Sequence, residues 1–280
     1  MISFREERTI AGSGDRPITL DVTFNPDQRQ APIVVFCHGW KGFKDWGPWN
    51  VLADYFAEQN CFFVKFNYAH NGINPSDLSD ITDPESFAQN TFSYQLDDID
   101  RVINWLTDDN EEYRHYYNVA NITLIGHSLG GAMAILKTLD DERINRVISW
   151  AGAYNLRKFA ELDTDEHWKE KGHVVIQNSR TGQEYPLYYT FREDFLTHLD
   201  KYDLVKRLTE IDQPLMMIHG LQDDVSPISN ARKIHKVVSH SLLMENEGNH
   251  TFGGSHPWTE KKLPPILQQA ADNSIEFISL

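Results

Sequence analysis

The residue pattern with the clearest chemical meaning is a serine between two glycines, at residues 126–130. The sequence there is Gly-His-Ser-Leu-Gly, which fits the pattern G-x-S-x-G. An apolar, β-branched run precedes it and an alanine-rich run follows, so the segment predicts a strand, a sharp turn and a helix. Glycines beside such a turn tolerate the strained backbone that lifts the hydroxyl clear of the chain. We therefore predict that Ser128 is a nucleophile rather than a serine that only caps a helix.

A serine hydroxyl is a poor nucleophile at neutral pH and needs a base, which in turn needs an orienting carboxylate. Asp223 follows a predicted buried strand through a glycine-containing turn, and His250 follows the next strand in the same way. The carboxyl ends of parallel strands meet at one edge of a sheet, so these side chains should lie beside Ser128. The sequence therefore predicts a catalytic triad of Ser128, Asp223 and His250.

The rest of the chain predicts the elements that position these residues. Two stretches with period-two alternation, residues 2–10 and 17–24, predict an antiparallel hairpin. About six further strands then alternate with helices, which is typical of a mostly parallel, doubly wound α/β sheet of about eight strands. The predicted helices include residues 45–59, 87–106, 202–208, 230–238 and 263–278. A chain of this length fits one such domain, residues 1–280.

The alternation of strands and helices is interrupted at residues 154–200, after the sixth strand. This insertion contains a charged segment and a predicted β-hairpin, residues 173–177 and 185–189. It leaves the sheet at the edge where the nucleophile is expected, so we predict that it forms a lid. Its candidate substrate contacts are Tyr185, Leu187, Tyr188 and Tyr189. The alternative is that these side chains pack the hairpin onto the body or form a dimer contact.

Composition limits the partners. The net charge of −15, without a basic patch, argues against nucleic acid and anionic membranes as partners. The N-terminus has no apolar stretch of signal-peptide length, and no apolar run approaches the roughly 20 residues that span a bilayer. We therefore expect a cytoplasmic protein that acts on a small molecule, and a homo-oligomer is compatible with the sequence. Cys37 and Cys61 lie in apolar strands and are expected to be free, buried thiols.

Metal and cofactor sites are not expected. Asp97, Asp98 and Asp100 lie on a predicted helix and favour a solvated acidic face over a metal site. Several histidines precede or follow glycine at turns and are interpreted as packing or hydrogen-bonded residues, not as metal ligands or as a second base: His38, His127 and His219. No H-E-x-x-H pattern or paired ligand spacing occurs, so we predict no metal and no cofactor.

Four motifs together resemble a known family. They are His38-Gly39-Trp40, the segment 126–131, the segment 219–223 and the segment 248–252. The whole chain resembles α/β-hydrolases of the serine esterase and dienelactone-hydrolase-like group, which includes bacterial cinnamoyl (feruloyl) esterases. The resemblance implies an α/β-hydrolase fold with the lid after the sixth strand. It also implies that the backbone N–H groups of Trp40 and Leu129 form an oxyanion hole.

The chain departs from the family pattern at two places. Dienelactone hydrolases proper have a cysteine where this chain has Ser128, so that particular activity is not expected. The usual valine before the proline of the acid loop is Ser226 here, with Val225 one position early. Asp224 therefore remains a reserve candidate for the acid.

The sequence as a whole predicts a serine hydrolase that cleaves carboxylic esters through an acyl-enzyme, with aromatic or other apolar acyl groups as favoured substrates. Two alternatives remain open at this stage. The same three residues serve peptidases and thioesterases, because one constellation can attack amides and thioesters. A hydrolase fold can also bind a ligand or partner without catalysis.

Overall fold

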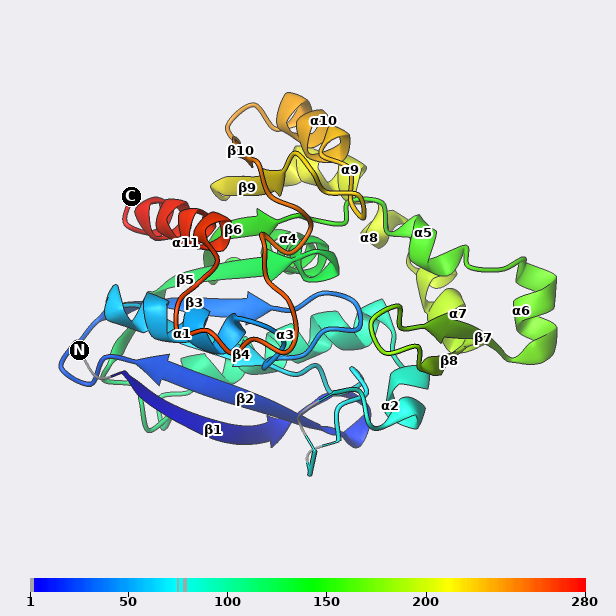
Figure 1. Cartoon of the computed structure of the whole chain (residues 1–280), viewed down its shortest axis with the longest axis horizontal. Coiled ribbons are helices and arrows are strands. Elements are labelled where there is room, and N and C mark those ends of the chain that lie inside the picture. Colours follow the sequence, from blue (N-terminus) through cyan, green and yellow to red (C-terminus); the bar gives the residue numbers. More distant parts are fainter. Residues whose placement is uncertain (1–2, 75, 78–79) are drawn as a thin grey trace.

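The computed structural model describes residues 3–74, 76–77 and 80–280 and is built on one eight-stranded sheet (Figure 1). The strand order is β1-β2-β4-β3-β5-β6-β9-β10. The strands are β1 (Phe4–Ala11), β2 (Pro17–Phe24), β3 (Ala31–Cys37), β4 (Phe62–Phe66), β5 (Tyr117–His127), β6 (Ile144–Trp150), β9 (Leu215–Gly220) and β10 (Leu242–Asn246). The longer helices around the sheet are α1 (Trp49–Glu58), α3 (Phe92–Thr107), α4 (Leu129–Asp140), α10 (Ser229–Val237) and α11 (Pro265–Ile278).

The sheet is parallel from β4 through β10, and β2 joins β4 in the antiparallel sense. The leading hairpin is also confirmed, because β1 pairs with β2 in register from Phe4 opposite Phe24 to Ala11 opposite Pro17. Residues 1 and 2, where the predicted first strand approaches the N-terminus, lie outside the described residues. The sequence therefore predicted the α/β class, the sense of the sheet and the number of strands.

Alternating side chains of the central strands fill two apolar cores, one on each face of the sheet. Ile33 and Val35 of β3 belong to the core beneath α3 and α4. Val34 and Phe36 belong to the core beneath α1 and α11. Both faces are covered, which explains why these strands read as continuous apolar runs. Among the described residues, no helix is both long and apolar enough to cross a membrane.

The structure corrects several predicted helix boundaries. The helix predicted over residues 87–106 is two helices, α2 (Pro84–Ala88) and α3, because the Thr91 hydroxyl accepts a hydrogen bond from the Tyr94 N–H and starts a new helix. The helix predicted over 202–208 is also divided. There the Asp203 carboxylate accepts from the Lys206 N–H and starts α9 (Leu204–Arg207). Side chains that cap helix N-termini thus divide segments that the spacing of apolar residues alone predicts as single helices.

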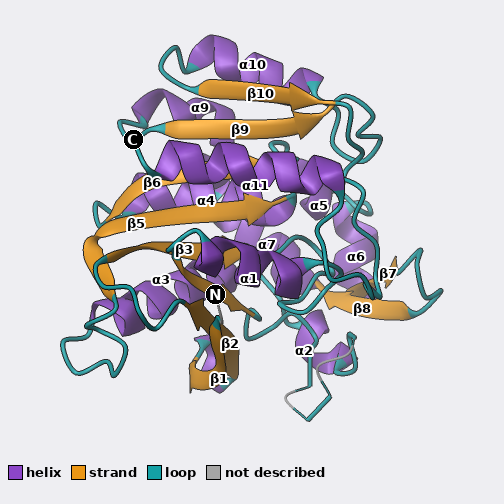
Figure 2. Ribbon diagram, turned by 60° about the vertical axis from the view of Figure 1, so that its left-hand side comes forward, coloured by secondary structure: helices purple, strands orange, loops and turns teal. Residues whose placement is uncertain are grey.

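The insertion after β6 folds as short elements beyond the carboxyl ends of the central strands (Figures 1 and 2). They are α5 (Arg157–Ala160), α6 (Asp165–Lys171), β7 (His173–Gln177), β8 (Glu184–Tyr188), α7 (Tyr189–Thr197) and α8 (Leu199–Tyr202). β7 and β8 form the predicted hairpin as a separate two-stranded sheet. The second strand ends one residue earlier than predicted, because Tyr189 begins α7.

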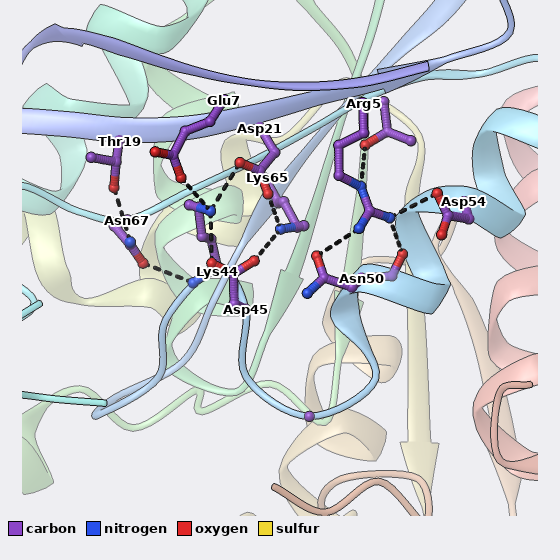
Figure 3. Close-up of polar contacts among 12 residues, drawn as sticks. Arg5, Glu7, Thr19, Asp21, Lys44, Asp45, Asn50, Asp54, Lys65 and Asn67 are labelled. Atoms are coloured by element: carbon purple, nitrogen blue, oxygen red, sulfur yellow. Dashed lines mark hydrogen bonds and ion pairs between the residues drawn. The ribbon is translucent and has the colours of Figure 1, made fainter. Parts of the chain in front are cut away.

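Buried charges tie the loop after β3 to strands β2 and β4 (Figure 3). Lys65 on β4 has a fully buried side chain, whose ammonium pairs with Asp21 and lies 2.7 Å from Asp45 Oδ1. Lys44 Nζ lies 2.9 Å from Asp21 Oδ1, 2.7 Å from Asp45 Oδ2 and 3.0 Å from Glu7 Oε2. Burial would raise the pKa of Asp45, but the charges of Lys65 and Lys44 outweigh burial and hold this pKa below its usual range. The ion pairs of Asp45 therefore contribute stability at neutral pH, and this contribution is lost as the pH falls through the lowered pKa of Asp45.

Replacing the buried cation should be strongly destabilising. Lys65→Met leaves two carboxylates with one ammonium fewer in a buried site, so we expect it to lower the free energy of unfolding by about 3 kcal/mol or more. The matched control is Lys206→Met, which removes an exposed pair with Asp200 and should leave this free energy almost unchanged. Urea unfolding of both variants at pH 7 measures the difference. Equal effects would mean that the network contributes no more than a surface pair.

Candidate active site

Ser128 stands at a strained turn between a strand and a helix. β5 ends one residue before it and α4 begins one residue after it, as predicted. Its backbone has φ 55° and ψ −119°, and its N–H donates to the Trp150 carbonyl at 2.9 Å. A Cβ on Gly126 would lie 2.1 Å from the Gly130 carbonyl oxygen, so the turn closes only with glycine at that position. The strain holds the Ser128 side chain at the carboxyl end of the sheet.

The structure brings the three predicted residues of the triad into one chain of hydrogen-bonding atoms. His250 Nε2 lies 2.9 Å from Ser128 Oγ, and His250 Nδ1 lies 2.9 Å from Asp223 Oδ2. These distances suit a nucleophile, a base and an orienting carboxylate. The reserve candidate for the acid, Asp224, is exposed. The geometry therefore favours Asp223 over its neighbour.

Asp223 is held as a buried anion. Its Oδ1 accepts hydrogen bonds from the Val225 N–H at 2.9 Å and the Ser226 N–H at 2.8 Å, while its Oδ2 lies 3.2 Å from His219 Nε2. Burial by itself would raise the pKa of the Asp223 carboxyl. Hydrogen bonds from His219 and His250 outweigh burial and hold this pKa well below its usual range. The carboxylate is therefore ionised at any pH near neutrality.

Two other histidines near the site, His127 and His38, are neutral at pH 7. Burial, together with the nearby His250, lowers the pKa of His127 to about 3, and His127 Nε2 lies 2.8 Å from the His250 carbonyl oxygen. Burial lowers the pKa of His38 to about 4. His219 Nε2 lies 2.6 Å from the Ser226 carbonyl oxygen, which makes it the donor in that contact. These contacts agree with the interpretation of the three as packing or hydrogen-bonded residues, and His219 adds a role that the sequence did not suggest, as a support for Asp223.

Possible metal ligands and two cysteines occur in the described part of the chain. Within residues 3–74, 76–77 and 80–280, no group of three or more His, Cys, Asp or Glu side chains could hold a metal ion. Cys37 and Cys61 are free and buried, as predicted. Burial raises the pKa of both thiols to about 12, so neither forms a thiolate at neutral pH.

The loop after β3 passes directly beside the nucleophile. A Cβ on Gly39 would lie 2.9 Å from Ser128 Cβ, and a Cβ on Gly130 would lie 2.1 Å from the Cys37 carbonyl oxygen. Among the hydrogen bonds of the described residues, none uses the N–H of Trp40 or of Leu129. Leu129 is the first residue of α4, where N–H groups lack partners within the helix. Within the described residues, neither N–H is therefore used by the fold, and each belongs to a residue adjacent in sequence to Gly39 or Ser128.

A layer of amides that the sequence analysis missed supports this loop from behind. Asn71 Nδ2 lies 3.1 Å from Asn67 Oδ1 and 3.3 Å from His38 Nε2. Asn67 also accepts from the Lys44 N–H at 2.8 Å and donates to Thr19 Oγ1 at 3.0 Å (Figure 3). These side chains are buried, so their hydrogen bonds fix the loop. The available signal was two asparagines in the loop after a buried strand, Asn67 and Asn71, at the same edge of the sheet as the triad.

A cavity of about 250 Å³ opens beside Ser128 and His250. Its walls come from three parts of the chain: the loop after β3, the elements that hold the triad, and the tip of the β7–β8 hairpin. The residues of the loop and the tip that line it include Trp40, Lys41, Trp46, Asn178, Ser179 and Arg180. The insertion therefore contributes residues to the cavity through its hairpin tip.

The four predicted substrate contacts lie elsewhere on the insertion. Tyr185 is buried with its ring 5.4 Å from that of Phe87, and Leu187 is fully buried. The hydroxyls of Tyr188 and Tyr189 donate to carboxylates on α2 and α6, respectively. None of the four lines the cavity. They pack and tie down the insertion, and the lining gives no support to a role in substrate contact.

The chain is similar to known proteins in sequence pattern and in fold. A sequence model for the alpha/beta hydrolase fold family matches residues 32–171, half of the chain. Among curated proteins, none has a sequence that matches this chain. Est1E from Butyrivibrio proteoclasticus with ferulic acid bound has a TM-score of 0.72 at 15% identity, over 97% of this chain and 98% of that chain.

Two other solved structures are also similar. Mouse alpha/beta hydrolase domain-containing protein 10 has a TM-score of 0.69 at 16% identity, over 98% of both chains. A puromycin-hydrolyzing peptidase of Mycobacterium tuberculosis has a TM-score of 0.65 at 16% identity, over 99% of this chain and 39% of the peptidase. The family match and the eight-stranded sheet lead to one conclusion: this chain belongs to the alpha/beta hydrolase fold family.

Proposed function

We propose that this protein is a serine hydrolase that cleaves carboxylic esters of small molecules through an acyl-enzyme. The observation that carries the proposal is the pair of 2.9 Å contacts that link Ser128 to His250 and His250 to Asp223 at the wall of a cavity. An ionised, buried Asp223 beside a base is the arrangement that activates a serine hydroxyl. The intact triad also argues against the alternative of a binding protein without catalysis.

In the first half of the reaction, Ser128 Oγ attacks the ester carbonyl carbon while His250 Nε2 takes the hydroxyl proton. A bond forms between Oγ and the carbonyl carbon, and the carbonyl oxygen becomes an oxyanion. The N–H groups of Trp40 and Leu129 donate to this oxygen. Asp223 stabilises the imidazolium that forms on His250. Collapse of the intermediate breaks the ester bond, and His250 returns the proton to the departing alcohol oxygen.

In the second half, water replaces the alcohol. His250 takes a proton from the water as its oxygen attacks the acyl carbon, and the same two N–H groups stabilise the second oxyanion. Release of the carboxylic acid regenerates the Ser128 hydroxyl, because His250 returns the proton to Oγ. Water supplies the oxygen atom and the proton, and His250 carries out both proton transfers of this half.

Aromatic or other apolar acyl groups suit the cavity. Its lining residues include Trp40, Trp46 and Trp49, and the first two are only partly buried, so their side chains can offer apolar surface to a substrate. Est1E, which has the same fold, binds ferulic acid, an aromatic acid. The likeness to a puromycin-hydrolyzing peptidase keeps amide cleavage as the second candidate, with thioester cleavage beside it. Rates on matched ester, thioester and aminoacyl-amide substrates would separate the three.

The proposal includes a lid formed by residues 154–200. Two features support it. The hairpin tip at Asn178–Arg180 lines the cavity. The Trp40 ring lies 5.7 Å from the ring of Phe159 and 5.5 Å from that of Phe191, so the insertion packs directly on the loop that carries the proposed oxyanion donor. A change in the insertion would therefore alter the space available to the acyl group.

Ser128→Ala should abolish ester turnover and leave the fold intact, because the hydroxyl is removed from a turn without creating a core cavity. The assay is hydrolysis of 4-nitrophenyl acetate, with circular dichroism to follow the fold. In parallel, a fluorophosphonate probe should label the wild-type protein at Ser128 and should not label the variant. Substantial residual turnover by the variant would overturn the assignment of the nucleophile.

Asp223→Asn should lower kcat by orders of magnitude, since loss of the orienting carboxylate in a serine protease triad costs about 10⁴-fold. Asp224→Asn is the matched control, and this exposed neighbour should have little effect. Steady-state kinetics on one ester compares the two variants. A reversed result would assign the acid to Asp224.

Shortening the hairpin should change substrate preference while Ser128 stays reactive. Replacing residues 178–183 with Asn-Gly joins the paired residues Gln177 and Glu184 by a two-residue turn. We expect kcat/KM for aryl acyl esters relative to short alkyl esters to fall severalfold, because the tip no longer lines the cavity. Glu166→Ala, an exposed change on α6, is the control. An unchanged preference would mean that the insertion is structural only.

A further inference from the structure

Among the described residues, those that line the cavity beside Ser128 include cations but no carboxylate. Apart from histidine, its charged lining residues are Lys41 and Arg180, and none of the lining residues is Asp or Glu. This contrasts with the whole chain, which carries 41 acidic and 26 basic residues. The charge of the cavity wall is therefore opposite in sign to the net charge of the protein, which favours an anionic group inside the cavity.

The two cations differ in how their charge is balanced. Arg180 Nη2 lies 2.5 Å from Asp80 Oδ2, so this guanidinium already has an anionic partner. Lys41 Nζ donates to the Gln177 carbonyl oxygen at 3.0 Å. Within the part of the chain that the structure describes, the Lys41 ammonium forms no ion pair. An ammonium has three N–H donors, so it retains capacity for an anion from outside the chain.

Another lysine of the same loop shows what a structural cation looks like in this protein. Lys44 is nearly fully buried, and its ammonium is surrounded by Asp21, Asp45 and Glu7 (Figure 3). Lys41, three residues earlier, is half-buried at the cavity wall without such partners. Burial lowers the pKa of the Lys41 ammonium, as expected for a cation that loses water and gains no counter-ion.

The backbone holds Lys41 beside the proposed oxyanion donor. Its φ of 58° is in the left-handed region, where a lysine is uncommon. The turn is closed by a hydrogen bond from the Gly42 N–H to the Gly39 carbonyl oxygen at 2.9 Å. A Cβ on Gly42 would lie 2.9 Å from that same oxygen, so the turn is tight. Lys41 therefore occupies a fixed position next to Trp40, on the side of the loop that faces the cavity.

We propose that Lys41 is a specificity-determining residue that binds a carboxylate carried by the ester substrate. The inference rests on the proposed ester hydrolysis and names its substrate class: esters with a free carboxylate in either the acyl or the alcohol part. The ammonium donates to the carboxylate while the aromatic walls hold the apolar part of the molecule. The contact forms in a partly dry cavity, where a pair of opposite charges attracts more strongly than in open water.

The test uses two pairs of esters that differ by a carboxylate in place of a methyl group. The acyl arm compares the monophenyl ester of adipic acid with phenyl hexanoate. The alcohol arm compares 4-acetoxybenzoate with 4-methylphenyl acetate. The quantity measured is the ratio of kcat/KM for the anionic ester to kcat/KM for the neutral one, at pH 7.5 and one fixed ionic strength.

Wild-type protein should prefer the anionic ester in at least one arm, and Lys41→Met should lower that ratio by about tenfold, as for loss of a charge-assisted contact. Lys41→Gln should act in the same direction, and Lys41→Arg should retain most of the preference. The control is Lys236→Met, an exposed change on α10 that should not alter the ratio.

Two results would overturn the inference. One is the absence of an anion preference in both arms of the wild type. The other is an equal loss on both esters in Lys41→Met, which would limit Lys41 to its bridge to the Gln177 carbonyl. Hydrolysis of the neutral esters keeps these results distinct from failure of the proposed function. If neither ester is hydrolysed and the fluorophosphonate probe does not label Ser128, both proposals fail.

Discussion

Close packing of backbone around Ser128 is the constraint on which the site depends. Two chain segments meet there at distances that exclude a side chain: a Cβ would lie 2.1 Å from a carbonyl oxygen at Gly126 and at Gly130, and 2.9 Å from Ser128 Cβ at Gly39. Because no side chains separate them, the backbone of the turn after β5 packs directly against the backbone of the loop after β3, and neither can move without the other. The proposed nucleophile and oxyanion donors are therefore fixed relative to each other by backbone, before any substrate arrives.

Buried polar groups extend this rigidity away from the turn. The loop after β3 is held at one end by the close approach of Gly39 to Ser128 and farther along by the salt bridge between Lys44 and Asp21 on β2. Between them, Asn67 and Asn71 occupy the space behind the loop. A buried carboxylate or ammonium without partners is costly, so these groups tolerate few alternative arrangements. Their main effect on the site is to hold the loop in one conformation, and their contribution to the stability of the fold is secondary.

The sequence was sufficient for the parts of the site that follow from topology. Ser128, Asp223 and His250 each follow a strand of the parallel part of the sheet, and parallel strands end at one sheet edge, so their convergence could be expected without coordinates. The sense of the sheet followed from the alternation of strands and helices in the same way. These predictions depended on where along a strand a residue lies, which apolar periodicity reports directly.

Partners across the fold could not be predicted in this way. Periodicity gives the face on which Lys65 lies, but not that a loop carboxylate from Asp45 meets it there. The same limit explains the insertion. Tyr188 and Tyr189 had the composition of a binding surface, yet their hydroxyls meet carboxylates on short helices whose positions no local pattern encodes. The residues that line the cavity, Asn178–Arg180, lie instead at a polar hairpin tip that reads as an ordinary turn.

An anionic substrate meets two opposite electrostatic forces in this protein. The net charge repels it at long range, and the cations of the cavity attract it at short range. The net charge of −15 repels an anion approaching through water, but this field is screened beyond about 8 Å at physiological ionic strength. Apart from histidine, the charged residues that line the cavity are Lys41 and Arg180, and the second is already paired with Asp80. Added salt would weaken both the distant repulsion and the local attraction, so salt dependence alone cannot isolate the contribution of Lys41. A neutral substitution at Lys41, compared at constant ionic strength, changes the distant field by one charge among many and removes the contribution of the Lys41 ammonium to the local attraction.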